Sequence, residues 1–367
     1  MNFKKITIFI FVSIFFFSCE KDDSNDSINN DDFNRYAVLL NWADNIIIPA
    51  YDDFQSSLME LDNALNMFVQ TPTVELLLTA SDVWLDSYKV WQHIEMFDIG
   101  LAEVINYKGK MNIYPTDSEL IIQNIESGNY DLNNNNNFDA RGFPALDYML
   151  HGLAENSDDI VNVYIKNPSY ATYLINLINS MVYNTSLITQ DWTSYREDFV
   201  NSTDNTATSS VNKMTNDFIF YFEKGLRANK IGIPAGIFSS NTLPNTVEAY
   251  YKQDVSKQLA LEALLATKNF FIGQHYDSSI YGESLDSYLD FISVSSNNNL
   301  SEDILLQFNE AESEVNQLNN NFVYQIETNN NQMLYAYDAI QLLVVSFKVD
   351  MLQSLAISVD YVDADGD

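Results

Sequence analysis

The sequence predicts an all-α protein built as two helical bundles packed side by side. Apolar residues recur at helical spacing over long stretches, and few stretches alternate as strands do. The chain has 367 residues, enough for two domains of ordinary size. Aromatic residues make up 13% of it, which indicates packed globules rather than a disordered acidic tail.

The first element, residues 1–18, has the pattern of a lipoprotein signal peptide. Lys4 and Lys5 form a basic start, an apolar run covers 6–17, and a serine precedes Cys19. The run is shorter than the roughly 20 residues of a membrane-spanning helix. The order resembles a lipobox, so we expect cleavage before Cys19 and lipidation of that cysteine. An ordinary secretory signal with a chance cysteine is the alternative.

Residues 19–32 are expected to form a disordered tether, because nearly all of them are polar. Glu20-Lys21-Asp22-Asp23 resembles the acidic, lysine-containing export signals of some Gram-negative lipoproteins. We therefore expect an outer-membrane lipoprotein at the cell surface, held to the membrane through Cys19. The periplasmic face is the alternative location.

The N-terminal bundle is expected over residues 33–200. Its first helix covers residues 33–70, where Pro49 should kink or break the helix because it has no backbone N–H. Thr73 is placed to cap the next helix. The elements that follow are a helix, a loop, a short helix and a long helix, over 73–100, 107–141, 144–151 and 168–199.

A linker is predicted at residues 201–211, where Asn, Ser and Thr dominate. It leads to the C-terminal bundle, residues 212–367. The helices expected there lie over 211–228, 246–272, 301–325 and 331–356.

Charge and cysteine content exclude several classes of function. The formal net charge is -33, which repels nucleic acid, so we expect no nucleic-acid partner. Cys19 is the only cysteine, and its lipidation leaves no thiol for disulfides, zinc ribbons, iron–sulfur clusters or nucleophilic catalysis. The sequence has no H-E-x-x-H, G-x-S-x-G, Walker loop or dinucleotide fingerprint. We therefore assign no catalytic residue.

The segment Gly142-Phe-Pro-Ala-Leu-Asp-Tyr-Met-Leu-His-Gly152 is the most informative internal stretch. With it, the chain resembles the imelysin family, and supporting fragments occur in order at 44–51, 91–100, 112–117 and 348–363. The resemblance implies an exported, all-helical protein of two bundles, marked by the motif G-x-H-x-x-E. The family has been described as metallopeptidases and as proteins linked to iron acquisition.

Two of the three motif positions depart from the family pattern. Gly142 matches the motif glycine, whereas Pro144 stands at the histidine and Asp147 at the glutamate. Pro144 has no ligand atom, and Asp147 keeps a carboxylate on a shorter stem. The departure argues against metal binding at the motif, and more strongly against peptidase activity.

Asp147 and His151 are spaced i, i+4 and face one way on a helix. With ligands from elsewhere they could hold a divalent metal or iron. We favour another interpretation, in which an acid near the start of a short helix and a histidine near its end complement the helix dipole. Upstream, Asp139 and Arg141 are either a polar lining or loop residues.

The resemblance implies a binding protein for iron or other metal acquisition. One alternative is a metal-dependent peptidase, which needs three protein ligands and an activated water. The other is a binding protein for a peptide or surface component, with the cleft between the bundles as its site. The sequence does not name the ligand, and a divalent metal or iron is the cofactor that the resemblance suggests.

Overall fold

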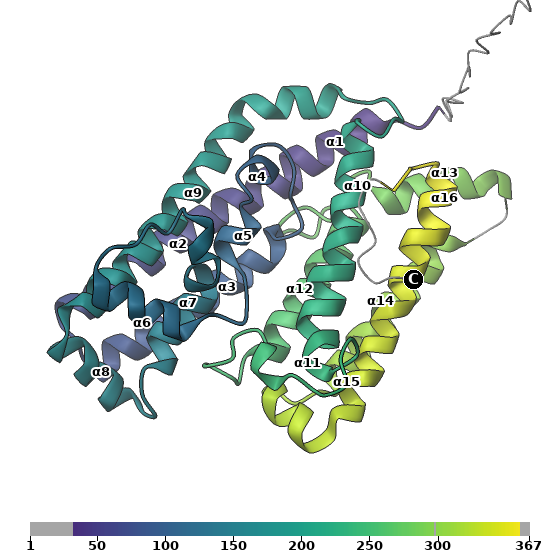
Figure 1. Ribbon diagram of the computed structural model, residues 1–367. Helices are drawn as coiled ribbons and strands as arrows, with labels where there is room; N and C mark the ends of the chain where they lie inside the picture. Colours follow the sequence, from purple (N-terminus) through teal and green to yellow (C-terminus); the bar gives the residue numbers. More distant parts are fainter. Residues whose placement is uncertain (1–31, 297–298, 360–367) are drawn as a thin grey trace, which may run out of the picture.

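The computed structural model describes residues 32–296 and 299–359 (Figure 1). Within those ranges the regular structure is helical, apart from an isolated bridge between Gln274 and Tyr281. This confirms the all-α prediction. The signal peptide, Cys19 and residues 360–367 lie outside the described residues. No helix in the described part of the chain is long and apolar enough to cross a membrane.

The first long helix runs from Arg35 to Gln70, close to its predicted bounds. Pro49 does not end it, because a π-helical turn just before the proline changes the hydrogen-bond register there. The helix therefore consists of three segments, which are α1 (Arg35–Asn41), η1 (Trp42–Ile47) and α2 (Ile48–Gln70).

The N-terminal bundle is built around α2, which packs against α3 (Val74–Ile94) and α9 (Pro168–Asn201). Thr73 caps α3 as expected, since its side chain accepts a hydrogen bond from the Leu76 amide. Smaller helices close the bundle, namely α4 (Leu101–Val104), α5 (Lys108–Met111), α6 (Ser118–Ser127), η2 (Asn135–Ala140), α7 (Gly142–Asp147), η3 (Tyr148–Gly152) and α8 (Ser157–Lys166).

The loop predicted over 107–141 is wrong in part, because α6 lies within it. Asp117 caps this helix by accepting a hydrogen bond from the Leu120 amide at 2.9 Å, and Gly128 ends it in the left-handed conformation. Ile121 and Ile125 are buried in the main hydrophobic cluster. A short helix of this kind depends on such packing more than on its own propensity.

Residues 202–209 lead from α9 to the second group of helices, near the predicted linker. That group begins with α10 (Ser210–Phe220), which continues through the π-helical η4 (Tyr221–Gly232) into α11 (Ile233–Ala235). The remaining elements are η5 (Pro244–Thr246), α12 (Ser256–Phe271), α13 (Leu285–Ser296), α14 (Leu300–Asn316), α15 (Phe322–Val345), η6 (Ser346–Met351) and α16 (Leu352–Leu355).

In the second group, two predicted helix boundaries are wrong and one helix was not expected. The helix expected from 246 begins at Ser256, because Ala249 and Gln253 adopt positive φ angles of 56° and 67°. The break expected after 325 falls at 317–321 instead. Helix α13 was not expected, and its buried Leu285 and Tyr288 show that packing holds it.

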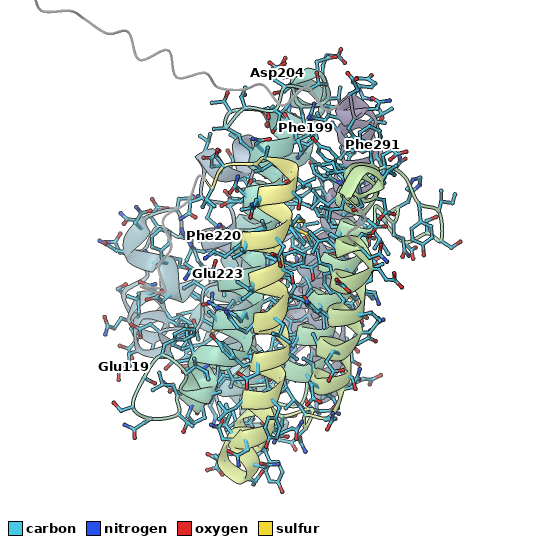
Figure 2. The ribbon with its side chains drawn as sticks, turned by 90° about the vertical axis from the view of Figure 1, so that its right-hand side faces the viewer. Glu119, Phe199, Asp204, Phe220, Glu223 and Phe291 are labelled. Atoms are coloured by element: carbon cyan, nitrogen blue, oxygen red, sulfur yellow. The ribbon has the colours of Figure 1, made fainter. Side chains whose placement is uncertain are left out.

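The two groups of helices lie side by side, with α2, α3 and α9 in one and α10, α12, α14 and α15 in the other (Figure 1). They meet where α3 packs against α12. One cluster of buried apolar residues runs through both groups. On the outer face of the second group, α15, η6 and α16 form one long rod, with Phe220 and Glu223 beside it (Figure 2).

Candidate functional site

The motif glycine has a structural role at the start of α7. Gly142 has a φ of +73°, and a side-chain carbon there would lie 2.1 Å from the carbonyl oxygen of Met111. Any other residue would collide with that backbone, so only glycine fits.

Pro144 and Asp147 line one small cavity of about 110 Å³. The rest of the lining includes Tyr114 and Pro115 and, from the second bundle, Val247, Ala249, Tyr250 and Tyr251. The motif positions therefore share a site between the bundles. Pro144 contributes a ring that has no atom able to bind a metal.

Asp147 is 1% exposed, and its two oxygens accept hydrogen bonds from the other bundle. Oδ2 accepts from the amide of Tyr251 at 2.8 Å, and Oδ1 accepts from the amide of Lys252 at 2.9 Å. His151 Nδ1 lies 2.9 Å from the same Oδ1. The carboxylate thus joins the short motif helix to the segment before α12.

His151 continues this chain of contacts toward α3. Its Nε2 lies 2.7 Å from the hydroxyl of Ser81, and its ring meets that of Trp84 edge-on at 5.1 Å. The order Ser81–His151–Asp147 is that of a hydrolase triad. However, Ser81 is 3% exposed and lies outside the cavity that Asp147 lines, so its hydroxyl is closed to a substrate. These contacts hold α3, the motif helix and the segment before α12 together, and we call Ser81, His151 and Asp147 the brace.

The residues at the motif do not fit a metal centre. Pro144 offers no ligand, and the oxygens of Asp147 already accept N–H groups. Among the described residues, no three His, Cys, Asp or Glu side chains gather as a metal site requires. A metal on Asp147 and His151 stays a prediction, and their contacts favour the brace.

The two upstream candidates are not part of the cavity. Arg141 is 3% exposed and donates to the carbonyl oxygens of Gly109 and Leu132. Asp139 has an exposed side chain, and its carbonyl oxygen accepts from the amide of Asp117 at 2.7 Å. Both hold the chain around α6 and η2 in place.

A second polar region lies buried between the bundles. Asn112 Nδ2 donates to Glu95 at 2.9 Å and to Glu248 at 3.0 Å. Lys230, on η4, donates to the other oxygen of Glu248 at 2.6 Å. We use the name inter-bundle chamber for these four residues together with Trp91 and Tyr221.

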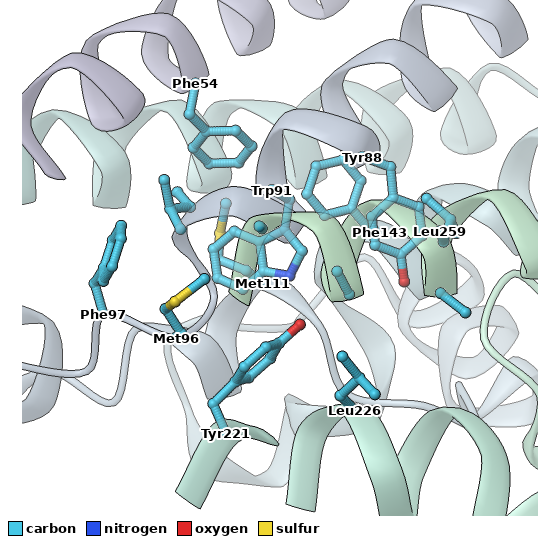
Figure 3. Packing of buried hydrophobic residues seen from close by; sticks show 14 of the residues in the cluster. Phe54, Tyr88, Trp91, Met96, Phe97, Met111, Phe143, Tyr221, Leu226 and Leu259 are labelled. Carbon is cyan, nitrogen blue, oxygen red and sulfur yellow. The ribbon is translucent and has the colours of Figure 1, made fainter. Parts of the chain in front are cut away.

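Three polar atoms of the inter-bundle chamber are buried without a hydrogen-bond partner. They are Trp91 Nε1, Glu95 Oε2 and the hydroxyl of Tyr221. Lys230 Nζ lies 3.9 Å from Glu95 Oε2. Figure 3 shows the ring nitrogen of Trp91 and the hydroxyl of Tyr221 pointing toward one another. Both donors face the Glu95 carboxylate, so these groups form one buried polar cluster with Lys230.

The surroundings shift the pKa values of the acidic groups in the inter-bundle chamber. Burial raises the pKa of Glu95 above its ordinary value, and the Glu248 carboxylate adds to the shift while Lys230 and Asn112 oppose it. Burial and then the two carboxylates also raise the pKa of Tyr221 well above its ordinary value. Tyr221 is therefore a neutral hydrogen-bonding group.

A cavity of about 220 Å³ opens beside the inter-bundle chamber. Its walls come from the end of α3, the segment 106–113 and the junction of α10 with η4. Charged, amide and aromatic side chains share this lining, including Glu95, Lys108, Asn112, Phe220, Tyr221 and Lys224.

The sequence gives little sign of the inter-bundle chamber. Glu95 lies in one of the family-like fragments, but a single acid at a helix end is an ordinary feature. Sequence spacing correctly separates it from His93, which faces the other bundle and lies 2.7 Å from Glu262. Glu248 and Lys230 carry no local signal, because their partners are distant in the chain.

Comparisons with known proteins match this chain to a family. The family model described as imelysin matches residues 47–347. Iron-regulated protein A of Synechococcus elongatus is 24% identical over 118 residues, which is 32% of each chain. The match thus spans about a third of that relative.

Two crystal structures share the fold. One, from Parabacteroides distasonis and provisionally described as an iron-regulated protein A precursor, gives a TM-score of 0.72 at 18% identity, covering 88% of this chain and 95% of the other. An imelysin-like protein from Psychrobacter arcticum gives 0.68 at 16% identity, covering 89% and 97%.

Proposed function

Because this chain belongs to the imelysin family, we propose that it is an exported binding protein for the acquisition of iron or another metal. The inter-bundle chamber carries this proposal. There the Trp91 indole, the Glu95 carboxylate and the Tyr221 hydroxyl meet beside a cavity of about 220 Å³. Small-ligand sites are largely preformed cavities in which a few convergent polar groups orient the ligand. The names of the relatives, iron-regulated protein A and its precursor, support the iron-related role and export.

Binding accounts for the motif region better than peptide hydrolysis does. A metallopeptidase needs three protein ligands and an open position for water. Pro144 removes one ligand, and Asp147 is held by the amides of Tyr251 and Lys252. The motif region then serves to hold the bundles together around the inter-bundle chamber.

The first residues of the sequence support a proposal for the location. We propose that Cys19 carries the lipid and that the helical body stands on the outer membrane, at the cell surface. The polar residues after Cys19 would act as a tether between the body and that membrane.

The test uses the purified mature protein and a deletion strain. We expect the deletion to slow growth when iron is limiting, and we expect no cleavage of casein with or without added zinc. Proteolysis that a chelator abolishes would establish the peptidase alternative instead. The metal-acquisition role would be overturned by two results together. The deletion would have no effect on growth that depends on iron supply, and the purified protein would bind neither iron nor zinc in solution.

A second candidate function is favoured by a groove between α3 and α12. The groove is open, has a volume of about 740 Å³, and contains the His93–Glu262 pair together with Asp53, Asp86 and Asp277. Its size and acidic walls suit a basic peptide of a surface component. Binding of a fluorescent lysine-rich peptide that Glu262→Gln weakens would support this function, and equal binding by both proteins would contradict it.

A further inference from the structure

We infer that a groove on the outer face of the second bundle binds a basic amphipathic helix of another protein. The groove lies between α14 and α15 and has a volume of about 550 Å³. The inference goes beyond the proposed function, because this surface is separate from the inter-bundle chamber. It is carried by an exposed apolar stripe, by the acidic walls beside that stripe, and by the lack of cations along both helices.

The exposed stripe runs along α15 and η6. Tyr335, Leu342 and Val349 follow one another at intervals of seven residues and are 57%, 55% and 55% exposed. Asp338 and Val345 lie between them and are also exposed. We call these five residues the outer stripe. Their alternating spacing of three and four residues is that of the seam through which one helix packs against another.

The outer stripe lies on an uncovered face of the molecule. Figure 2 looks onto the rod of α15, η6 and α16, and no other described helix crosses in front of it. Single exposed apolar residues are ordinary on a protein surface, whereas four in one helical seam indicate a contact surface. From Tyr335 to Val349 the seam is about 20 Å long, which is enough for a partner helix of two heptads.

The groove beside the outer stripe has acidic walls. Glu310 and Glu314 line it from α14, and Asp338 lines it from α15. The side chains of Gln317 and Gln332 each donate to Glu314 at 3.0 Å, which fixes that carboxylate at the groove. No lysine, arginine or histidine of the described chain contributes to this lining.

The two helices also carry no cation of their own. Residues 300–347 contain seven acidic residues and no lysine, arginine or histidine. Lysines reach α14 from α12, where Lys268 Nζ lies 4.0 Å from Glu312, a residue that lines the groove on that other side. The acidic walls beside the outer stripe therefore attract positive charge from outside the bundle.

This charge distribution selects the partner. A second copy of the chain would bring Glu310, Glu314 and Asp338 against acids of the same kind, and such like-charge contacts oppose association. Residues 360–367 carry four acids and no cation, so they have the same sign as the groove. Asp338 stands within the seam itself, where a polar residue sets register and choice of partner. A helix with apolar residues on one face and lysines or arginines beside them complements both features.

The probe is a fluorescent helical peptide of two heptads, with leucines at the seam positions and lysines beside them. We expect it to bind the mature protein in fluorescence anisotropy, more weakly at about 500 mM than at about 50 mM salt because salt screens exposed charges. A peptide of the same composition, shuffled so that it has no apolar face, should bind much more weakly.

Two substitutions separate the apolar and the charged contributions. Leu342→Gln should weaken binding about five- to tenfold, because it removes apolar surface that the peptide covers. Asp338→Asn should weaken binding and reduce its dependence on salt. The matched controls are Leu78→Gln on α3, where the leucine is 51% exposed, and Asp158→Asn on α8. Both controls should leave the affinity unchanged, and circular dichroism checks that all four variants keep the fold.

Three results would overturn the inference. Equal binding of the shuffled peptide would show attraction by charge alone. Binding that Leu342→Gln leaves intact and Glu262→Gln abolishes would place the peptide in the groove between α3 and α12. A dimer in sedimentation velocity that Leu342→Gln dissociates would assign the outer stripe to a second copy of the chain. The growth of the deletion strain under iron limitation tests the proposed function independently of these measurements.

Discussion

At the scale of single residues, Glu95 is an acid whose ionised form is disfavoured by its surroundings. Its pKa is raised by burial and by Glu248, so between the ordinary value of 4.5 and the raised value the folded protein binds more protons than the unfolded chain. Stability therefore falls as pH rises through that window. The inter-bundle chamber is thus stabilised by mild acid.

The first prediction tests this pH dependence of stability by replacing Glu95. Glu95→Gln should raise the melting temperature at pH 7.5, by about 2–4 °C for each kcal/mol of relieved strain in a chain of this size. The difference from the parent protein should shrink as pH falls toward 4.5. Thermal denaturation across pH 4–8 measures both effects. A variant that is destabilised equally at every pH would show that Glu95 is needed in its charged form.

The second prediction concerns Asp147 as a brace. Asp147→Ala leaves the amides of Tyr251 and Lys252 and the ring of His151 without their acceptor. The free energy of unfolding should fall by about 3 kcal/mol or more, since each buried unsatisfied group costs about 1–3 kcal/mol. Urea denaturation measures it, with exposed Asp158→Ala as the control. A loss of under about 0.5 kcal/mol, the size expected for a surface site, would refute the brace.

The third prediction restores the family motif. Pro144 and Asp147 line the same cavity wall, so Pro144→His with Asp147→Glu places an imidazole and a carboxylate side by side. We expect the double variant to gain measurable zinc affinity that the parent protein lacks at this position. Calorimetry with zinc compares the two proteins. Tight zinc binding by the parent that is lost in Asp147→Ala would instead make Asp147 and His151 a true metal site.

At the scale of elements, η4 is the segment that completes the inter-bundle chamber. Its wider π-helical turns place Tyr221 and Lys230 on the face toward the N-terminal bundle. Lys230 is the cation nearest to both Glu95 and Glu248. The element thus supplies the positive charge that two buried acids from other segments require.

The fourth prediction tests that dependence. Lys230→Met leaves Glu248 buried without its cation, and removal of one partner of a buried ion pair costs about 3–5 kcal/mol. The carboxylates would then bind protons more readily, so the loss should be large at pH 7.5 and smaller at pH 5. Urea denaturation at the two pH values measures it, with Lys213→Met on α10 as the control. A loss independent of pH would contradict the charge argument.

At the scale of the whole molecule, the acidic helical body and its expected lipid anchor are separate features. The charge of -33 repels anionic surfaces, so the body would not hold itself on a membrane. The acyl chains on Cys19 would have to do so.

The fifth prediction follows from that division. Cys19→Ala should abolish fatty-acid labelling and move the protein from the membrane fraction to the soluble fraction, with the helical far-UV circular dichroism spectrum of the body unchanged. The variant keeps Ser18, the serine before the cysteine, because the substitution is designed to leave export unchanged. Continued membrane association with unchanged labelling would contradict the anchor.

The sequence by itself determined the fold class and most long helices. Apolar spacing along 33–70 and the proline that opens 168–199 are local features, and helices form from local hydrogen bonds. The sequence also identified Gly142 and Asp147 as positions that matter, through their resemblance to a family motif. It predicted no helix over α6, where packing of Ile121 and Ile125 decides the outcome.

Only the tertiary structure decided what those positions do. The segment before α12 is bound to Asp147, because Tyr251 and Lys252 donate their amides to a carboxylate more than 100 residues away in the chain. The inter-bundle chamber likewise joins Asn112 to Glu248 across a separation of 136 residues. Contacts at such separations leave no periodic trace in the sequence, because the chain segments that make them meet only after both bundles have packed.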